Sequence, residues 1–354
     1  MDEFKVDAHK LIYHVDRVSQ WLKGQVIYPL YIEIAPSGGC NHRCIFCALD
    51  YLQYQPAYLS TDILKTFLKD IAQKGVQSIM FAGEGEPLLH KDIAGLIGYS
   101  KEQGLDIAVT TNGVLLAKKL SAEILPHLSW LRISLNAGTA KTYASIHNTA
   151  EKDFEKVINN IEEALAIKKQ IGSSCTIGAQ FLLLNENYQE AEGLAQKLKG
   201  IGVDYLIIKP YSQHPHSLNQ LRSALDYEKL LFLEEMLNKY NSEKFNIIFR
   251  KKTMVKTKRK KIYTQCLGLP FWTYLSSQGD LYACSSFLGD ARFLYGNIYQ
   301  TSFTEAWNSQ QRERISELMR HNWDIEQCRQ VCRMDEINHY LWELKNPPAH
   351  VNFI

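Results

Sequence analysis

The 354-residue sequence has no long apolar run, few prolines and almost no excess of charge of either sign. No stretch approaches the roughly 20 apolar residues of a membrane span, and charged residues interrupt the amino terminus where a secretion signal would be apolar. Ten prolines, 20 glycines and no repeated period exclude collagenous, solenoid and disordered proteins. The net charge of +2 indicates no particular partner. What remains is a globular chain, 45% hydrophobic and long enough for about two domains.

Cysteines are the feature that this sequence does have. Of eight, seven lie in two groups, and Cys175 stands apart. The first group is Cys40, Cys44 and Cys47; the second is Cys266, Cys284, Cys328 and Cys332. Secreted disulfide proteins are usually short and loop-rich, whereas this chain is long and core-rich. The pattern therefore predicts reduced cytoplasmic thiols that hold metal.

The first group follows a strand-like run, Tyr31 to Ala35, and has the spacing Cys-x3-Cys-x2-Cys. An iron–sulfur cluster of the 4Fe–4S type normally takes four cysteines, so three leave one iron open to a small-molecule ligand. A zinc site completed by His42 is the alternative.

Short apolar segments alternate with amphipathic ones beyond this loop, which predicts β-α units and a parallel sheet. The expected strands are residues 31–35, 78–82, 106–111, 130–135, 175–184 and 203–211, and the expected helices are 61–74, 92–103, 118–125, 153–171, 188–199 and 225–241. Parallel sheets bind ligands at the carboxyl ends of their strands, where the first cysteine group begins.

The polar residues at other strand ends complete a pattern that resembles the radical S-adenosylmethionine (radical SAM) superfamily. The second strand ends in Gly83-Glu84-Gly85-Glu86-Pro87, similar to the Gly-Gly-Glu-Pro motif of that family, although Glu84 stands where a glycine is common. The resemblance implies the following cofactor-binding residues: Phe46, Gly83, Gly85, Glu86, Thr111, Asn112, Ser134 and Asn136.

The second cysteine group resembles the SPASM or twitch extension of radical SAM enzymes, except that three residues and not two separate Cys328 from Cys332. The resemblance implies one auxiliary 4Fe–4S cluster besides the cluster that binds SAM; structural zinc is the alternative. It also implies a partial (β/α)6 barrel over residues 28–240, a small SPASM/twitch-like domain over 241–354 and a helical extension over 1–27.

Eight basic and no acidic residues occupy positions 250–261. We interpret this run as a solvated linker, because no aromatic residue interrupts it; binding of a phosphate, a nucleotide-linked substrate or an acidic redox partner is the alternative. Nucleic acid is a minor possibility.

The family chemistry implies reductive cleavage of SAM, with flavodoxin or ferredoxin as electron donor, and hydrogen abstraction from a substrate. The polar segment after the sixth strand supplies candidate catalytic residues: Lys209, Tyr211 and His214. Asp335, Asn338 and His339 are further candidates on an expected helix.

We expect dehydrogenation of a small polar substrate, such as a sugar, cyclitol or nucleotide-linked sugar, with the auxiliary cluster as electron acceptor. Epimerisation needs a thiol hydrogen donor, and the spare Cys175 lies at the wrong end of its strand. Peptide modification ranks lower, because the roughly 28 residues before the first strand are few for a packed leader-binding domain. A non-catalytic metal protein that binds nucleic acid is the alternative from another class.

Overall fold

One mixed sheet organises the computed structural model, which describes residues 4–219, 221 and 225–353. The strand order is β10-β9-β8-β1-β2-β3-β4-β5-β6-β7. The strands are β1 (Tyr31–Ile34), β2 (Ser78–Phe81), β3 (Asp106–Thr111), β4 (Trp130–Ser134), β5 (Thr176–Leu183), β6 (Tyr205–Pro210), β7 (Asn246–Phe249), β8 (Trp272–Leu275), β9 (Asp280–Tyr282) and β10 (Leu294–Asn297).

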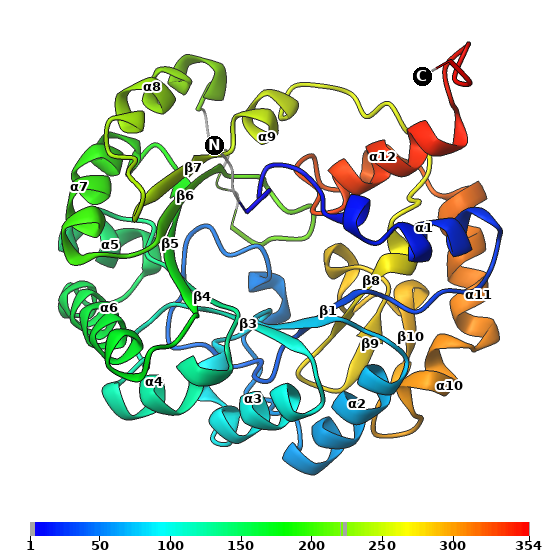
Figure 1. Ribbon diagram of the computed structural model, residues 1–354, viewed down its shortest axis with the longest axis horizontal. Helices are drawn as coiled ribbons and strands as arrows, with labels where there is room; N and C mark the ends of the chain where they lie inside the picture. The colour runs from blue at the N-terminus through cyan, green and yellow to red at the C-terminus, as the bar shows by residue number, and fades with distance from the viewer. Residues whose placement is uncertain (1–3, 220, 222–224, 354) are drawn as a thin grey trace.

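The helices are α1 (Val15–Leu22), α2 (Thr61–Gln73), α3 (Ile93–Glu102), α4 (Lys118–Ile124), α5 (Ala140–His147), α6 (Lys152–Ile171), α7 (Ala191–Ile201), α8 (Phe232–Asn238), α9 (Lys251–Lys256), α10 (Phe303–Trp307), α11 (Gln310–Glu317) and α12 (Asp335–Lys345). Helices α2 to α8 cover one face of the curved sheet, and Figure 1 shows them as an outer arc around the strands. Their apolar faces bury the outward side chains of the strands, as in other parallel sheets.

Strands β1 to β7 pair in parallel, which confirms the predicted α/β architecture. All six predicted strands are present, and β7 adds a seventh beside β6. The helix expected over 225–241 is shorter, because a 3-10 turn at Tyr227–Leu230 precedes α8.

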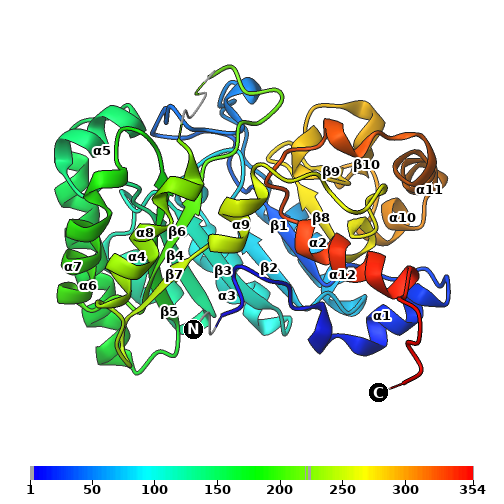
Figure 2. The ribbon, with the colours of Figure 1, turned by 90° about the horizontal axis from the view of Figure 1, so that it is seen from above.

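The second cysteine group belongs to a unit that continues the same sheet. β8 pairs in parallel with β1, and β9 and β10 follow as antiparallel neighbours. In Figure 2 the elements β8 to β10 and α10 to α12 gather on one side of the barrel strands. The C-terminal unit is therefore joined to the barrel through backbone hydrogen bonds, and the domain limits at 27 and 240 stay predictions.

The N-terminal segment packs against distant parts of the chain. Leu11 and Val18 share a buried cluster with Phe271 and Leu341 of the C-terminal unit. Phe4 lies against Tyr205 on the inner face of β6, with ring centroids 5.4 Å apart. This segment thus closes one end of the barrel.

The basic run is not simply solvated, and this corrects the linker interpretation. Four of its eight cations pair with acidic side chains of the same chain, and part of the run forms α9. The pairs are Arg250 with Asp7, Lys251 with Glu234, Lys256 with Asp335 and Glu336, and Lys258 with Asp226 and Glu228. Among the helices that the structure describes, none has the length and apolar character needed to cross a bilayer.

Candidate active site between two cysteine groups

The first cysteine group lies in the loop after β1, at the carboxyl edge of the sheet. Cys40, Cys44 and Cys47 are half-buried, and none forms a disulfide. Burial raises the pKa of all three thiols, and the proximity of Cys47 and Cys40 raises the pKa of Cys44 further. Thiolates gathered in this way need cations, so the loop fits a bound iron–sulfur cluster.

Histidines beside this loop do not complete a zinc site of the predicted kind. One ligand atom each of His42, Cys44 and His147 lies within 4.8 Å of the others, but this group contains a single cysteine. His147 comes from α5, and its Nδ1 lies 3.2 Å from Cys44 Sγ. Sequence reasoning missed His147, because nothing in the local pattern connects it with a loop that ends 100 residues earlier.

The turn after β2 packs directly on the first cysteine loop. A Cβ atom at Gly85 would overlap the backbone oxygens of Ser37 and Gly39, so only glycine fits. Gly83 has a φ of +109°, and a Cβ atom at this position would overlap the Tyr274 hydroxyl. Close backbone approach thus requires glycine at position 85, and the positive φ with the Tyr274 hydroxyl requires it at position 83; contacts of both with SAM stay predictions.

Glu86, expected to bind the amino group of SAM, is buried and already accepts three hydrogen bonds. The donors are the Thr111 hydroxyl at 2.6 Å, the backbone N–H of Asn112 at 2.8 Å and the backbone N–H of Leu88 at 3.1 Å. Burial raises its pKa to about 7. In this arrangement Thr111 and Asn112 orient Glu86, and the carboxylate retains acceptor capacity for an ammonium group.

A buried donor without a partner marks the end of β4. Asn136 is fully buried with a φ of +55°; its Oδ1 accepts the backbone N–H of Leu182, and its Nδ2 has no partner among the described residues. Because a buried amide left unpaired is costly, it fits an oxygen of an incoming polar cofactor. Ser134 is half-buried on the inner face of β4, and Phe46 packs edge-on against His147 at 5.2 Å. Their contacts with SAM stay predictions.

The second cysteine group converges from three separate segments. Burial is the main cause of the raised pKa of Cys266, and the nearby thiols of Cys332, Cys284 and Cys328 raise it further. Backbone N–H groups point at two of the sulfurs, from Ser286 to Cys284 and from Met334 to Cys332. The wider spacing between Cys328 and Cys332 therefore does not remove either thiol from the group, which fits one closed cluster.

Asn338 of α12 supports this second group, a role that sequence reasoning did not assign. Its Nδ2 lies 3.7 Å from Cys266 Sγ, and its Oδ1 accepts the backbone N–H groups of Leu267 and Gly268. Asp335 pairs with Lys256 and with the hydroxyl of Tyr263. Both residues are thus engaged in the fold of the C-terminal unit.

The predicted catalytic residues lie at the end of β6, with different capacities. Lys209 is half-buried; burial and nearby arginines lower its pKa to about 7. Tyr211 is buried, donates to Gln213 Oε1 at 2.7 Å, and has its pKa raised to about 12 by burial. His214 stacks on Tyr51 at 5.2 Å, and burial lowers its pKa to about 3.

The loop after β6 contacts both cysteine segments. On one side Ser217 Oγ donates to the Cys47 carbonyl at 3.3 Å, and the Asp50 carboxylate accepts the backbone N–H of Asn219 at 2.7 Å. On the other side the Ser212 carbonyl accepts from Arg329, which follows Cys328, at 2.8 Å. The two cysteine groups thus flank one polar loop.

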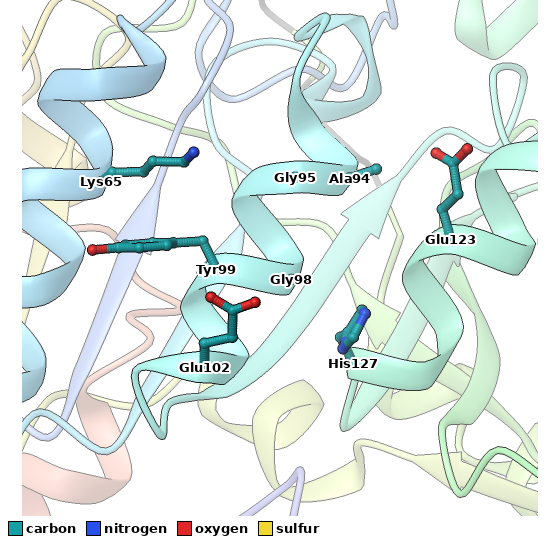
Figure 3. A pocket seen from close by; sticks show the side chains of 8 residues that line it. All are labelled: Lys65, Ala94, Gly95, Gly98, Tyr99, Glu102, Glu123 and His127. Atoms are coloured by element: carbon teal, nitrogen blue, oxygen red, sulfur yellow. The ribbon is translucent and has the colours of Figure 1, made fainter.

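A hollow elsewhere on the surface holds none of these residues. Helices α2, α3 and α4 line it, together with the turn that follows α4 (Figure 3). Lys65 lies over the ring of Tyr99 at its edge. The hollow is separate from the strand ends, and we assign it no function.

Comparisons with known proteins agree with this geometry. The radical SAM superfamily pattern matches residues 34–198, and the SPASM iron–sulfur cluster-binding domain matches residues 266–333. The chain is 30% identical to GTP 3',8-cyclase of Chlorobaculum tepidum over 189 residues, which are 52% of this chain and only 55% of the cyclase. It is 25% identical to AdoMet-dependent heme synthase of Methanosarcina barkeri over 329 residues, covering 87% and 88% of the two proteins.

Solved structures show the same fold. The crystal structure of Streptococcus suis SuiB bound to S-adenosylmethionine superposes with a TM-score of 0.65 at 19% identity, covering 85% of this chain and 70% of SuiB. The radical SAM and SPASM domains together imply SAM and two 4Fe–4S clusters, one that binds SAM and one auxiliary. The chain belongs to the radical SAM superfamily and is an enzyme of that superfamily with a C-terminal SPASM domain.

Proposed function

We propose that this radical SAM enzyme oxidises a polar substrate held between its two cysteine groups, with Lys209 as the proton acceptor. The contact of one loop with both cysteine segments carries this proposal, because a substrate beside that loop lies between the two cofactors. When bound, the cofactors supply a radical that takes a hydrogen atom from carbon and an acceptor for the electron that remains.

Lys209 suits the base better than the other two candidates. Burial lowers its pKa to about 7, so the neutral amine is accessible near neutral pH, and the residue is only partly buried. His214 Nδ1 accepts the backbone N–H of His216, so Nε2 carries the proton and acts as a donor. The Tyr211 hydroxyl stays protonated and is bonded to Gln213.

Epimerisation is the weaker alternative, because it needs a free thiol near the substrate. Cys175 is fully buried just before β5, at the opposite end of the sheet. Cys328 and Cys332 both lie within the second cysteine group. This arrangement supports oxidation over epimerisation.

The substrate proposal is kept at the level of a polar molecule. The relatives described above are named for GTP cyclisation and heme synthesis, so they lend no support to a sugar or cyclitol. These narrower substrates, and a flavodoxin or ferredoxin donor, stay predictions.

The deciding experiment is anaerobic turnover of the full chain with dithionite, SAM and candidate substrates, followed by mass spectrometry. We expect 5'-deoxyadenosine from the wild type and none from Cys44→Ala. A product that has lost two hydrogen atoms supports oxidation, whereas an isomeric product with hydrogen from solvent supports epimerisation. A crosslinked or oxidised peptide product would contradict the expectation of a sugar or cyclitol substrate and would support peptide modification.

A further inference from the structure

Several cations act on the side chain of Lys209 in β6. Burial is the first cause of the lowered pKa of Lys209, and the charges of Arg250, Arg132, Arg329 and Arg333 follow as further causes. Arg132 lies on β4, Lys209 on β6 and Arg250 directly after β7, whereas Arg329 lies between the last two cysteines and Arg333 directly after Cys332. Elements far apart in the sequence thus bring four arginines near enough to Lys209 for their charges to lower its pKa.

Acidic side chains neutralise only part of this charge. Arg250 lies 3.4 Å from the Asp7 carboxylate, and Arg333 pairs with Glu33 of β1. Arg132 packs over Trp130 at 4.5 Å and bonds the Tyr205 hydroxyl at 3.4 Å. Within the described ranges, neither Arg132, Arg329 nor Lys209 forms an ion pair with a carboxylate.

Two buried donors in the same place have no acceptor among the described residues. Arg329 Nε is one, although its Nη2 donates to the Ser212 carbonyl. The second is Nε2 of His214, a residue only 1% exposed. Arg329 lies near enough to His214 that its charge lowers the pKa of the imidazole. Buried cations and donors without acceptors are costly, so this cluster is suited to an anion.

We propose that Arg329 and His214 bind an anionic group of the substrate, a carboxylate or a phosphate, at the mouth of the barrel. This inference rests on the proposed function, since it names the substrate class of that site. The guanidinium of Arg329 offers paired donors to an oxyanion, and His214 Nε2 adds a third. Bound there, the anion would place the neighbouring carbon of the substrate beside the Lys209 amine.

The carboxylate of SAM is a second possible source of the anion, but the positions favour the substrate. The residues predicted to bind SAM end β2, β3 and β4 beside the first cysteine group. Arg329 instead follows Cys328 in the second group. The anion site is therefore on the side of the auxiliary cysteines.

Calorimetric titration of the anaerobic holoenzyme with inorganic phosphate and with succinate tests the proposal. We expect Arg329→Gln to weaken binding of the preferred anion about tenfold or more, and Arg329→Lys to weaken it less. Arg320→Gln is the matched control, because Arg320 is exposed in the same unit and contacts the nearby Glu317 carboxylate and Ser316 carbonyl. It should bind as the wild type does.

Several outcomes would overturn the proposal. Binding of neither probe by the wild type, or unchanged binding by Arg329→Gln, contradicts it directly. Loss of both probes when saturating SAM is added would assign the cations to the SAM carboxylate. If Arg329→Gln loses iron because its neighbour is Cys328, then His214→Phe decides, and unchanged affinity in that variant contradicts the site.

Measuring 5'-deoxyadenosine formation alongside anion binding separates a failure of the anion site from a failure of the proposed function. Retained SAM cleavage with weakened anion binding in Arg329→Gln supports the anion site. If the wild type cleaves no SAM, the proposed function is refuted. If it still binds the anion, and Arg329→Gln weakens that binding, the anion site is supported. The probe that binds more tightly distinguishes a phosphate from a carboxylate substrate.

Discussion

The carboxylate of Glu84 accepts a hydrogen bond from the backbone N–H of Ser277 at 2.5 Å. Ser277 lies in the turn between β8 and β9, so this bond joins the strand-end turn of the barrel to the C-terminal unit. Glu84 is the residue that departs from the family motif, where a glycine is common. The departure thus has a structural reason, namely attachment of the auxiliary unit to the barrel.

We expect Glu84→Ala to lower the free energy of unfolding by about 1 to 3 kcal/mol, because a buried hydrogen bond to a carboxylate is lost. Urea unfolding of the anaerobic protein measures the change. Glu123→Ala is the control: Glu123 is exposed on α4, and its 4.0 Å contact with Lys119 should be worth less than about 1 kcal/mol. Equal effects of the two substitutions would contradict the bridging role.

Gly85→Ala should disrupt the first cysteine loop, because its Cβ would overlap the backbone at Ser37 and Gly39. We expect loss of the iron held by that loop, measured after anaerobic reconstitution. Gly95→Ala is the matched control, since no atom lies within 4 Å of its Cβ position on α3. It should keep full iron content and gain about 0.5 to 1 kcal/mol of stability from helix propensity.

Iron content should separate the two cysteine groups. The anaerobic wild type should hold about eight irons, and a Cys40/Cys44/Cys47→Ala variant about four. The reason is that the second group gathers its four thiols without any contribution from the first. Loss of all iron in the variant would mean that the late cysteines hold zinc or no metal.

The pH dependence of turnover should report Lys209. Its pKa of about 7 lies below the usual value, so the amine is protonated and inactive as a base below pH 7 and active above it. Hence kcat/KM should rise about tenfold per pH unit below pH 7 and then level off. A bound anion would favour the ammonium form, so the inflection in kcat should lie at a higher pH than that in kcat/KM.

Lys209→Met is the companion measurement for this profile. It should abolish product formation while 5'-deoxyadenosine still forms, since the base acts after hydrogen abstraction. An unchanged pH profile in this variant would assign the inflection to another group. Because the pKa of His214 is lowered to about 3, His214→Asn should not move the inflection in kcat/KM, which reports the free enzyme.

Local patterns in the sequence determined most of the barrel and the identity of the cysteine groups. The strands predicted from apolar runs between amphipathic segments are present as β1 to β6, because a sheet covered by helices must be apolar on its outer face. The cysteine spacing and the glycine next to Glu86 are likewise visible in the chain, but only the tertiary structure shows that Gly85 packs against the backbone of Ser37 and Gly39.

Only the tertiary structure decided which distant residues share the site. The pairing of β8 with β1, the contact of Arg329 with Ser212 and the bond from Asn338 to Cys266 join segments 72 to 241 positions apart, and no local periodicity encodes such contacts. The same holds for the basic run, whose partners Asp7 and Asp335 lie far away along the chain. Charge complementarity and packing across the folded chain, not residue type alone, fixed these roles.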